Sequence, residues 1–500
     1  MKPMSRLKKW SKVDLYKRRA KEFWEVFKTS RKGLLGLGIL VFFIVIAAAA
    51  PLLAPHDPIL DTDLAGCRAK PIWLKWIAFP ELSENLFPVD DPGLTRVDSF
   101  NAFTVVTEPA NAPLTVNYVE DFGFKDKGFI LITYRRTQGE PLGPVKVKLS
   151  LPFEYIYDNP PAHFKAFVAA KYSSETGGEA RLRVYLIDKE GVRYCIWERA
   201  LIVNKWVYPS PSIDSRQAEL RLRIFQTTQR DPADVIFKGP GTYILEVEVE
   251  LLDDKEICIS SVQLDQIDIK LYGEAFGLLG TDFFGRDIWS QFIHGTRISL
   301  LVGLLASIIA VIVGLAVGVV SGYFGGPIDE ILMRFTDLLL VLPYLPLLLV
   351  LVALFGPNIW MIILILGLLG WMSFARIIRS QVLSLKERPF VEAARAIGAK
   401  SSHIIVKHIV PNVISLVYVT LALSVPSAIV AEAALSFLGF GDPFVMSWGR
   451  MLHDVHYYGA YTDLWWVIPP GLGIAFISLS FILIGYAIDE ILNPRLRRRW

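Results

Sequence analysis

The chain contains two kinds of sequence block, which differ in how apolar and polar residues are arranged. The first kind is a long uncharged run: residues 34–54 carry no charge, and as an α-helix rising about 1.5 Å per residue they would span roughly 30 Å, the thickness of a bilayer core. Five more long, predominantly apolar runs follow in the C-terminal half, at about residues 298–321, 335–355, 359–374, 413–437 and 466–488. The pattern predicts six transmembrane helices.

The second kind of block lies between the first run and the other five. Residues 71–275 lack long apolar runs and show a period of two instead, for which the clearest stretches are 181–188, 218–225 and 242–252. In the last of these, valine and leucine alternate with Glu246, Glu248 and Glu250, so we expect one face of each strand in the core and one in water. Glycine and proline clusters separate the strands. The insert is therefore predicted to be an antiparallel all-β domain, a sandwich or jelly-roll-like fold.

Small residues and prolines add detail to the helical part. Gly314, Gly318 and Gly322 repeat every four residues, which gives one helix face on which a second backbone can approach closely. Pro343 and Pro346 are expected to kink the helix predicted over 335–355. Both features favour a packed bundle of helices.

Composition agrees with a membrane protein. Hydrophobic residues make up 53% of the 500 residues and charged ones only 20%, which excludes an ordinary soluble enzyme of this length. The net charge of +3 gives no global reason to expect a nucleic-acid partner. Three cysteines without a C-x-x-C spacing argue against a metal site, and Cys195 and Cys258 either form one bridge or remain free.

The positions of the basic residues predict the orientation. Residues 1–33 form a basic, aromatic lead-in, for which the alternatives of a nucleic-acid arm or a cleaved signal are less economical. Basic residues also crowd 376–411 and the tail 493–500, whereas the loop 438–465 is acidic. Because positive segments stay on the cytoplasmic side, both termini are expected in the cytosol and the insert outside the cytoplasmic (inner) membrane.

One cytosolic segment carries a spaced motif. Glu392, Ala393 and Ala394 are followed by Gly398 and then by Pro411, and in this spacing the chain resembles the permease subunits of binding-protein-dependent ABC importers. His408 and Val410 stand where that signature has Ile and Leu. Further segments resemble the second permease subunit of the dipeptide and oligopeptide branch: APHDP at 54–58, LLGTDFFGRDIWSQFIHGTRISLL at 278–301, GYFGG at 322–326, LSFLGFG at 435–441, SWG at 447–449 and NPRLR at 493–497. The likeness covers about residues 33–70 and 277–499, and the insert has no part in it.

The resemblance implies a permease core over 277–492, with five of the six helices, and a coupling segment at 376–411. ATPase contacts would fall on Glu392, Ala393, Ala394, Gly398, Ala399 and Lys400. The implied partners are a homologous permease subunit, two ATPase subunits that bind ATP and Mg, and an extracytoplasmic solute-binding protein. The residues agree with this role, because helix formers precede Gly398, which can adopt the positive φ that ends a helix, and Pro411 can start the next one.

Candidate catalytic residues do not assemble into a site. Gly398, Ala399, Lys400 and Ser401 resemble part of a phosphate-binding loop, but Ala394 and Ala399 stand where that loop needs glycine, so we expect no ATP hydrolysis and no cofactor in this chain. Asp282 and Asp287 suggest an acid and base pair, yet a structural elbow in which Arg286 binds one carboxylate fits them better. His453, Asp454 and His456 are weak evidence for a metal, and their aromatic neighbours favour an interfacial belt.

Glu432 lies within a predicted span, where a charge requires a partner. It either lines the path or holds the outer gate, or it pairs with an arginine or backbone group of the sister subunit.

These observations predict a membrane permease subunit of an ATP-driven importer for peptides, working by alternating access. Two alternatives remain: a membrane-anchored carbohydrate- or ligand-binding receptor whose β-domain is the functional part, and a membrane enzyme with an external catalytic domain.

Overall fold

The computed structural model describes residue 21 and residues 23–138, 143–253 and 255–492. The predicted basic leader, up to residue 20, and the basic tail at 493–500 lie outside this part. The described chain forms two compact units. We call the one that holds residues up to Leu60 and from Ile288 onward the membrane unit, and Asp61–Asp287 the β unit.

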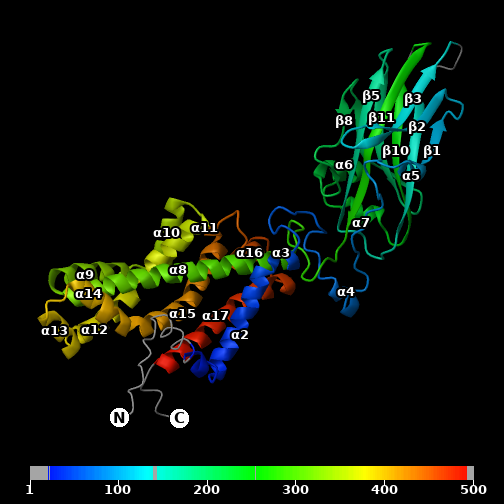
Figure 1. The fold of residues 1–500 in the computed structure, drawn as a ribbon. Helices are drawn as coiled ribbons and strands as arrows, with labels where there is room; N and C mark the ends of the chain where they lie inside the picture. The colour runs from blue at the N-terminus through cyan, green and yellow to red at the C-terminus, as the bar shows by residue number, and fades with distance from the viewer. Residues whose placement is uncertain (1–20, 22, 139–142, 254, 493–500) are drawn as a thin grey trace, which may run out of the picture. The chain divides into compact units, whose positions relative to one another are not determined.

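The membrane unit is all helical (Figure 1). Its elements are α2 (Arg31–Ala48), α3 (Ala50–Leu53), α8 (Ile288–Phe324), α9 (Gly326–Val341), α10 (Tyr344–Phe355), α11 (Ile359–Gly370), α12 (Met372–Lys386), α13 (Pro389–Ala396), α14 (Ser401–Ile404), the π-helical turn η1 (Ile405–Ile409), α15 (Val410–Leu435), η2 (Ser436–Phe440), α16 (Trp448–Tyr457) and α17 (Leu464–Leu492). Within the described residues, five helices are long and apolar enough to cross a membrane, or six if the bent pair α9 and α10 is one span.

Helices from the two ends of the chain lie side by side. Figure 1 shows α2 beside α17, and Ser480 of α17 donates a hydrogen bond of 2.7 Å to the carbonyl of Gly36 in α2. A Cβ at Gly36 would meet the Ser480 carbonyl at 2.7 Å, so only glycine permits this approach. The first apolar run therefore packs with the last one.

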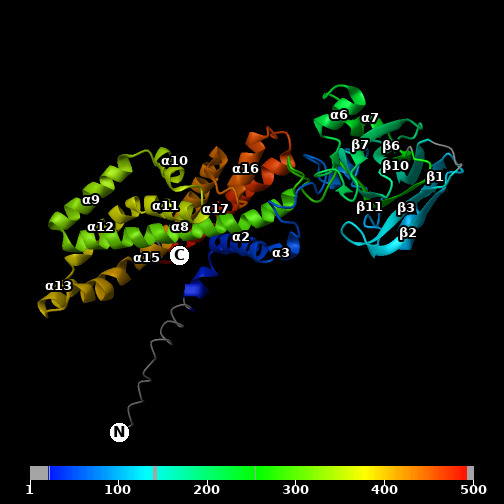
Figure 2. The ribbon, with the colours of Figure 1, turned by 90° about the horizontal axis from the view of Figure 1, so that it is seen from above.

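The expected close approach at the glycine repeat is confirmed. Gly314, Gly318 and Gly322 of α8 all face α12, and a Cβ at each would lie 2.9 Å or less from a backbone carbonyl or side chain of that helix or of its N-cap, Trp371. In Figure 2, α8 runs alongside α12. Small residues thus bring these two backbones together, as they commonly do in membranes.

Two of the predicted spans differ from the structure. The run 335–355 is not one kinked helix, because α9 and α10 meet at a bend of 93°. Pro343 caps α10 and forces Leu342 into an extended conformation. The run expected to begin at Val413 belongs to a continuous helical stretch from Ser401 to Phe440. Pro411 lies in the first turn of α15, as expected, but α15 continues directly from the π-helical turn η1, so Pro411 does not begin the helical stretch.

The β unit contains two antiparallel sheets. One has the strand order β1, β4, β10, β6, β7, and the other β2, β3, β11, β5, β8, with β9 paired to β5. The strands are β1 (Thr104–Glu108), β2 (Leu114–Phe122), β3 (Lys127–Arg136), β4 (Val145–Tyr155), β5 (His163–Ser174), β6 (Glu179–Ile187), β7 (Arg193–Leu201), β8 (Trp206–Val207), β9 (Ile213–Asp214), β10 (Gly241–Leu252) and β11 (Cys258–Tyr272). Short helices α4 (Trp73–Ile77), α5 (Val97–Asn101), α6 (Ala218–Phe225) and α7 (Pro232–Ile236) complete it.

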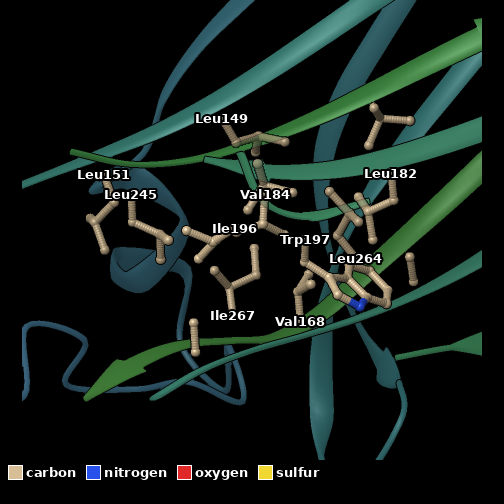
Figure 3. Packing of buried hydrophobic residues seen from close by; sticks show 14 of the residues in the cluster. Leu149, Leu151, Val168, Leu182, Val184, Ile196, Trp197, Leu245, Leu264 and Ile267 are labelled. Atoms are coloured by element: carbon tan, nitrogen blue, oxygen red, sulfur yellow. The ribbon is translucent and has the colours of Figure 1, made fainter. Parts of the chain in front are cut away.

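The core of the β unit lies between the two sheets. In Figure 3, side chains from β4, β6, β7 and β10 meet those from β5 and β11, and Val184, Leu264 and Leu149 are 2% exposed or less. The expected period-two strands are present at β6 and β10, since alternate residues of each point into this core.

One of the three period-two stretches is a helix instead. Residues Ala218–Phe225 form α6, and its core contacts come from Leu220 and Ile224, which are four residues apart. Eight residues rich in Ala, Glu, Leu and Arg satisfy both periods, and their intrinsic propensity favours the helix.

The outer face of the five-stranded sheet also departs from the expectation of a water-covered surface. Glu246 and Glu248 are only 7% and 3% exposed. Arg193 forms an ion pair with Glu246, and Arg183 donates to Glu248 at 3.1 Å. Cross-strand arginines therefore cover the glutamates. Cys195 and Cys258 are both free thiols, so they form no bridge.

Candidate functional site

The segment at residues 389–400 is a short helix with a sharp end. Pro389 occupies the first turn of α13, where its missing N–H costs nothing, and Glu392 lies where the helix dipole favours a negative charge. At the other end, the N–H of Gly398 donates to the Arg395 carbonyl at 3.0 Å and that of Ala399 to the Ala394 carbonyl at 3.1 Å. These two bonds form a Schellman motif, for which Gly398 supplies a φ of +82°.

Two side chains anchor α13 to the membrane unit. Val391 is fully buried and Ala394 is 8% exposed, and both belong to a cluster that includes Ile378 and Val382 of α12 and Ile404 of α14. The rest of α13 faces outward: Glu392, Ala393, Arg395 and Gly398 are exposed. The helix is thus fixed on one face and open on the other.

The exposed surface combines charge with apolar side chains. Ile397 is 85% exposed at the tip of the turn, and Val406 is 69% exposed on the next helical turn. Lys400 and Lys407 are exposed beside them, whereas Ala399 is half-buried. An apolar tip with a basic border is suited to bind in a groove on a second protein.

The chain after the turn continues as one helical stretch through Pro411. Because proline has no N–H, the regular hydrogen bond to the carbonyl four residues back is lost. The π-helical turn η1 immediately precedes this point, and the side-chain amide of Asn412 donates to the His408 carbonyl at 2.6 Å. The segment therefore passes from α13 through Gly398 directly into the long helix that carries Glu432.

Two ion pairs connect the helices next to this segment, and their partners could not be predicted from the sequence. Arg379 of α12 donates to both carboxylate oxygens of Asp329 in α9 at 2.6 Å, and Arg376 pairs with Asp337. Ser321 donates a further hydrogen bond to Asp329. Charges inside or beside apolar runs were the available signal. These pairs join α12, which leads into α13, to the first half of the bent span.

Glu432 is buried within this chain, with 1% exposure. Its Oε1 accepts hydrogen bonds of 2.7 Å from both the Ser436 and Ser447 hydroxyls. The other carboxylate oxygen, Oε2, has no hydrogen-bond partner in the described part of the chain. Ser447 also accepts from the Arg450 N–H at the start of α16. Glu432 therefore connects α15 to the beginning of α16.

The remaining candidates occupy structural positions. Arg286 donates to Asp282 Oδ2 at 2.5 Å, and Asp282 Oδ1 accepts from the Arg286 and Phe284 N–H groups, which forms a buried turn in the β unit. The expected pairing of Arg286 with a carboxylate is confirmed. His453 contacts the Phe437 carbonyl at 2.9 Å and His456 contacts the Tyr461 hydroxyl. Among the described residues, no three His, Cys, Asp or Glu side chains converge as metal ligands.

The membrane unit is therefore a bundle of long apolar helices in which a short helix, α13, is anchored on one face and exposed on the other, as in a multi-pass membrane protein. Residues 314–498 match the family described as "Binding-protein-dependent transport system inner membrane component", and residues 19–71 match the "N-terminal TM domain of oligopeptide transport permease C". The chain belongs to this permease family.

Named relatives agree with the family. Over 226 residues the chain is 41% identical to "Oligopeptide transport system permease protein OppC" of Haemophilus influenzae, covering 44% of this chain and 71% of the relative. It is 42% identical over 225 residues to "Dipeptide transport system permease protein DppC" of Bacillus subtilis, covering 44% and 69%. The family is one of transport permeases, so the alternatives of a receptor and of a membrane enzyme are not favoured.

Solved structures are more remote. An inward-facing MetNI methionine ABC transporter matches with 16% identity and a TM-score of 0.32, covering 40% of this chain and 96% of that one. TmCBM61 in complex with β-1,4-galactotriose matches with 12% identity and a TM-score of 0.22, covering 37% and 97%. Neither TM-score is high enough to support a conclusion about function.

Proposed function

We propose that this chain is a permease subunit of an ABC importer for peptides, coupled to separate ATPase subunits. The support is its membership of the permease family and the printed names of its relatives, which are oligopeptide and dipeptide permeases. A homologous permease, two ATPases carrying ATP and Mg, and a solute-binding protein would complete the transporter.

The orientation follows from charge. The basic residues around α13 favour the cytosolic side of the inner membrane, where both termini would also lie. The β unit would then be extracytoplasmic, and the loop before α17 would face the same side.

The observation that carries the coupling role is the geometry of α13, which is anchored by Val391 and Ala394 and exposed on its other face. When ATP closes the ATPase pair, a groove that holds this helix moves it as one body. The movement passes to α12 through the chain and to α9 through the Asp329–Arg379 pair. Alternating access results if α9 and α10 then shift about their bend.

Gly398→Val tests this role. The position has open space around it, with no atom within 4 Å of an added Cβ, so valine acts only through its poor fit to a φ of +82°. In the reconstituted transporter we expect peptide uptake to fall at least tenfold while ATP hydrolysis continues. The measurement is uptake of a labelled tripeptide and phosphate release in the same proteoliposomes.

Gly459→Val is the matched control. Gly459 ends α16 in a second Schellman motif, with a φ of +63° and no atom within 4 Å of an added Cβ. Its backbone strain is similar, but it lies in the loop before α17. Normal coupled uptake in Gly398→Val, or an equal loss in both variants, would contradict the coupling assignment.

A further inference from the structure

The membrane unit contains a cavity of about 470 Å³ between α8, α10, α11, α12 and α15. Its polar lining consists of hydroxyl groups, and none of its described lining residues is charged. The hydroxyl-bearing residues are Ser307, Tyr344, Ser373, Thr420, Ser424 and Ser427. Hydroxyls both donate and accept hydrogen bonds, so this wall can bind polar groups without selecting for charge.

Three interruptions of helices meet at this cavity. The bend between α9 and α10 lies directly before Tyr344, and the break between α11 and α12 at Trp371 lies between the lining residues Gly370 and Ser373. Pro426 interrupts the hydrogen bonding of α15 between Ser424 and Ser427. In membrane proteins, irregular backbone is tolerated where it lines a cavity, and broken helices often form solute sites.

The hydrogen bonding of the lining hydroxyls is a second observation that points to a ligand. Ser424 is satisfied by its own helix, because its Oγ donates to the Thr420 carbonyl at 2.8 Å. Ser307 is 1% exposed, and its Oγ has no partner in the described part of the chain. A buried hydroxyl without a partner costs free energy, so one that borders a cavity is available to a ligand or to water.

We propose that this cavity is a section of the solute path, where main-chain amides of a passing peptide hydrogen-bond to the hydroxyls. The inference rests on the proposed transport function and adds the contact residues to it. Amide groups occur in every peptide, so contacts to them do not depend on side-chain sequence. The absence of charge among the lining residues keeps each contact weak enough for the solute to leave.

Cysteine labelling in the assembled transporter tests the proposal without knowledge of the solute. The native Cys67, Cys195 and Cys258 are first replaced, and Ser373→Cys or Ser427→Cys is introduced, since both positions are exposed to the cavity. A membrane-impermeant, cationic methanethiosulfonate reports water access. We expect modification at least tenfold faster in one of two states, nucleotide-free or vanadate-trapped. Trialanine delivered by the binding protein is expected to slow it.

Ile312→Cys is the control on α8, because Ile312 is 61% exposed but does not line the cavity. It is expected to react slowly in both states. The inference would be overturned if Ser373→Cys and Ser427→Cys were as unreactive as Ile312→Cys while the unmodified transporter still takes up trialanine. That result would leave the transport function intact. State-dependent labelling without any peptide uptake or protection would support a solute path but contradict its use by peptides.

Discussion

The two units of this chain differ in how their inner polar side chains are satisfied. The β unit pairs full charges: Arg216 donates to Asp63 at 2.9 Å and to Asp214 at 2.7 Å, and Lys165 lies 2.7 Å from Asp63. The membrane unit keeps its Arg–Asp pairs beside the segment around α13 and uses hydroxyls between its long helices, as where Ser480 donates to the Gly36 carbonyl. A sheet bordered by water can keep partly hydrated ions, whereas small neutral groups can satisfy polar atoms between helices in lipid.

This difference predicts which substitutions destabilise each unit most. Removing one ion from a paired cluster leaves an opposite charge without its partner, which is costly. In the bundle, the close backbone contacts at glycine are the feature that tolerates least change. Four changes test this contrast, from the largest expected effect to the smallest.

Arg216→Met is expected to have the largest effect on stability. It leaves Asp63 and Asp214 with Lys165 as the remaining nearby ion-pair partner among those described, at 2.7 Å and 3.8 Å. Because Arg216 is about one-third exposed, we expect a loss of about 2 to 4 kcal/mol rather than more. Hydrogen exchange at β5 in the full chain measures it. Arg199→Met is the control, since its side chain is 59% exposed and 4.0 Å from Glu219, and should cost less than about 1 kcal/mol.

Acid is expected to destabilise the same cluster through His163. Burial lowers the pKa of His163 to about 4, and the positive charge of Arg216 acts in the same direction. The folded protein therefore holds this histidine neutral below pH 6.5, where the unfolded chain binds a proton. Stability is lost as the pH falls from about 6.5 toward 4, by about 2 kcal/mol at pH 5.

Unfolding of the purified chain, followed between pH 7.5 and 5.0, measures this loss. Burial raises the pKa values of Asp265 and Asp268, which works in the opposite direction at the acid end of this range. The comparison with His163→Phe isolates the histidine, because phenylalanine retains the stacking on Tyr272 at 4.4 Å. An unchanged pH dependence in this variant would contradict the prediction.

Gly318→Ala tests the bundle. The added Cβ would lie 2.5 Å from the Ala375 carbonyl oxygen, and backbone cannot move aside as a side chain can. We expect α8 and α12 to separate, with a loss of about 1 to 3 kcal/mol and a lower midpoint of thermal unfolding in detergent. Gly38→Ala in α2 is the control: no atom lies within 4 Å of its added Cβ, and alanine should stabilise by up to about 1 kcal/mol.

The sequence was sufficient for features set by local pattern. Apolar runs located the long helices, and the spacing of Gly314, Gly318 and Gly322 predicted a close helix contact. It was insufficient where short patterns are ambiguous or partners are distant. The helix at Ala218–Phe225 satisfied both periods, and Pro343 was expected to kink a helix that it instead divides at 93°. The sequence around Pro411 also did not predict the π-helical turn that precedes it and lets the helix continue.

The candidate site was predictable to the same extent. The turn at Gly398 follows from local chemistry, because a glycine after a run of helix formers ends the helix. One hydrogen-bond partner of Glu432 could be predicted from the sequence and the other could not. Ser436 follows Glu432 by four residues, which is a neighbouring position on a helix, whereas Ser447 reaches Glu432 across a loop.

Glu432→Gln gives the smallest expected effect, and its comparison with Glu432→Leu separates two explanations of the burial of Glu432. Glu432→Gln retains an oxygen that accepts from Ser436 and Ser447, so we expect a loss of about 1 kcal/mol or less. Glu432→Leu removes the acceptor for both hydroxyls and should lose about 1 to 3 kcal/mol. Thermal unfolding of the chain alone and of the assembled transporter measures both variants. If Glu432→Gln were as harmful as Glu432→Leu, and only in the assembled transporter, the negative charge itself would be needed there, as a pairing with an arginine of the sister subunit requires.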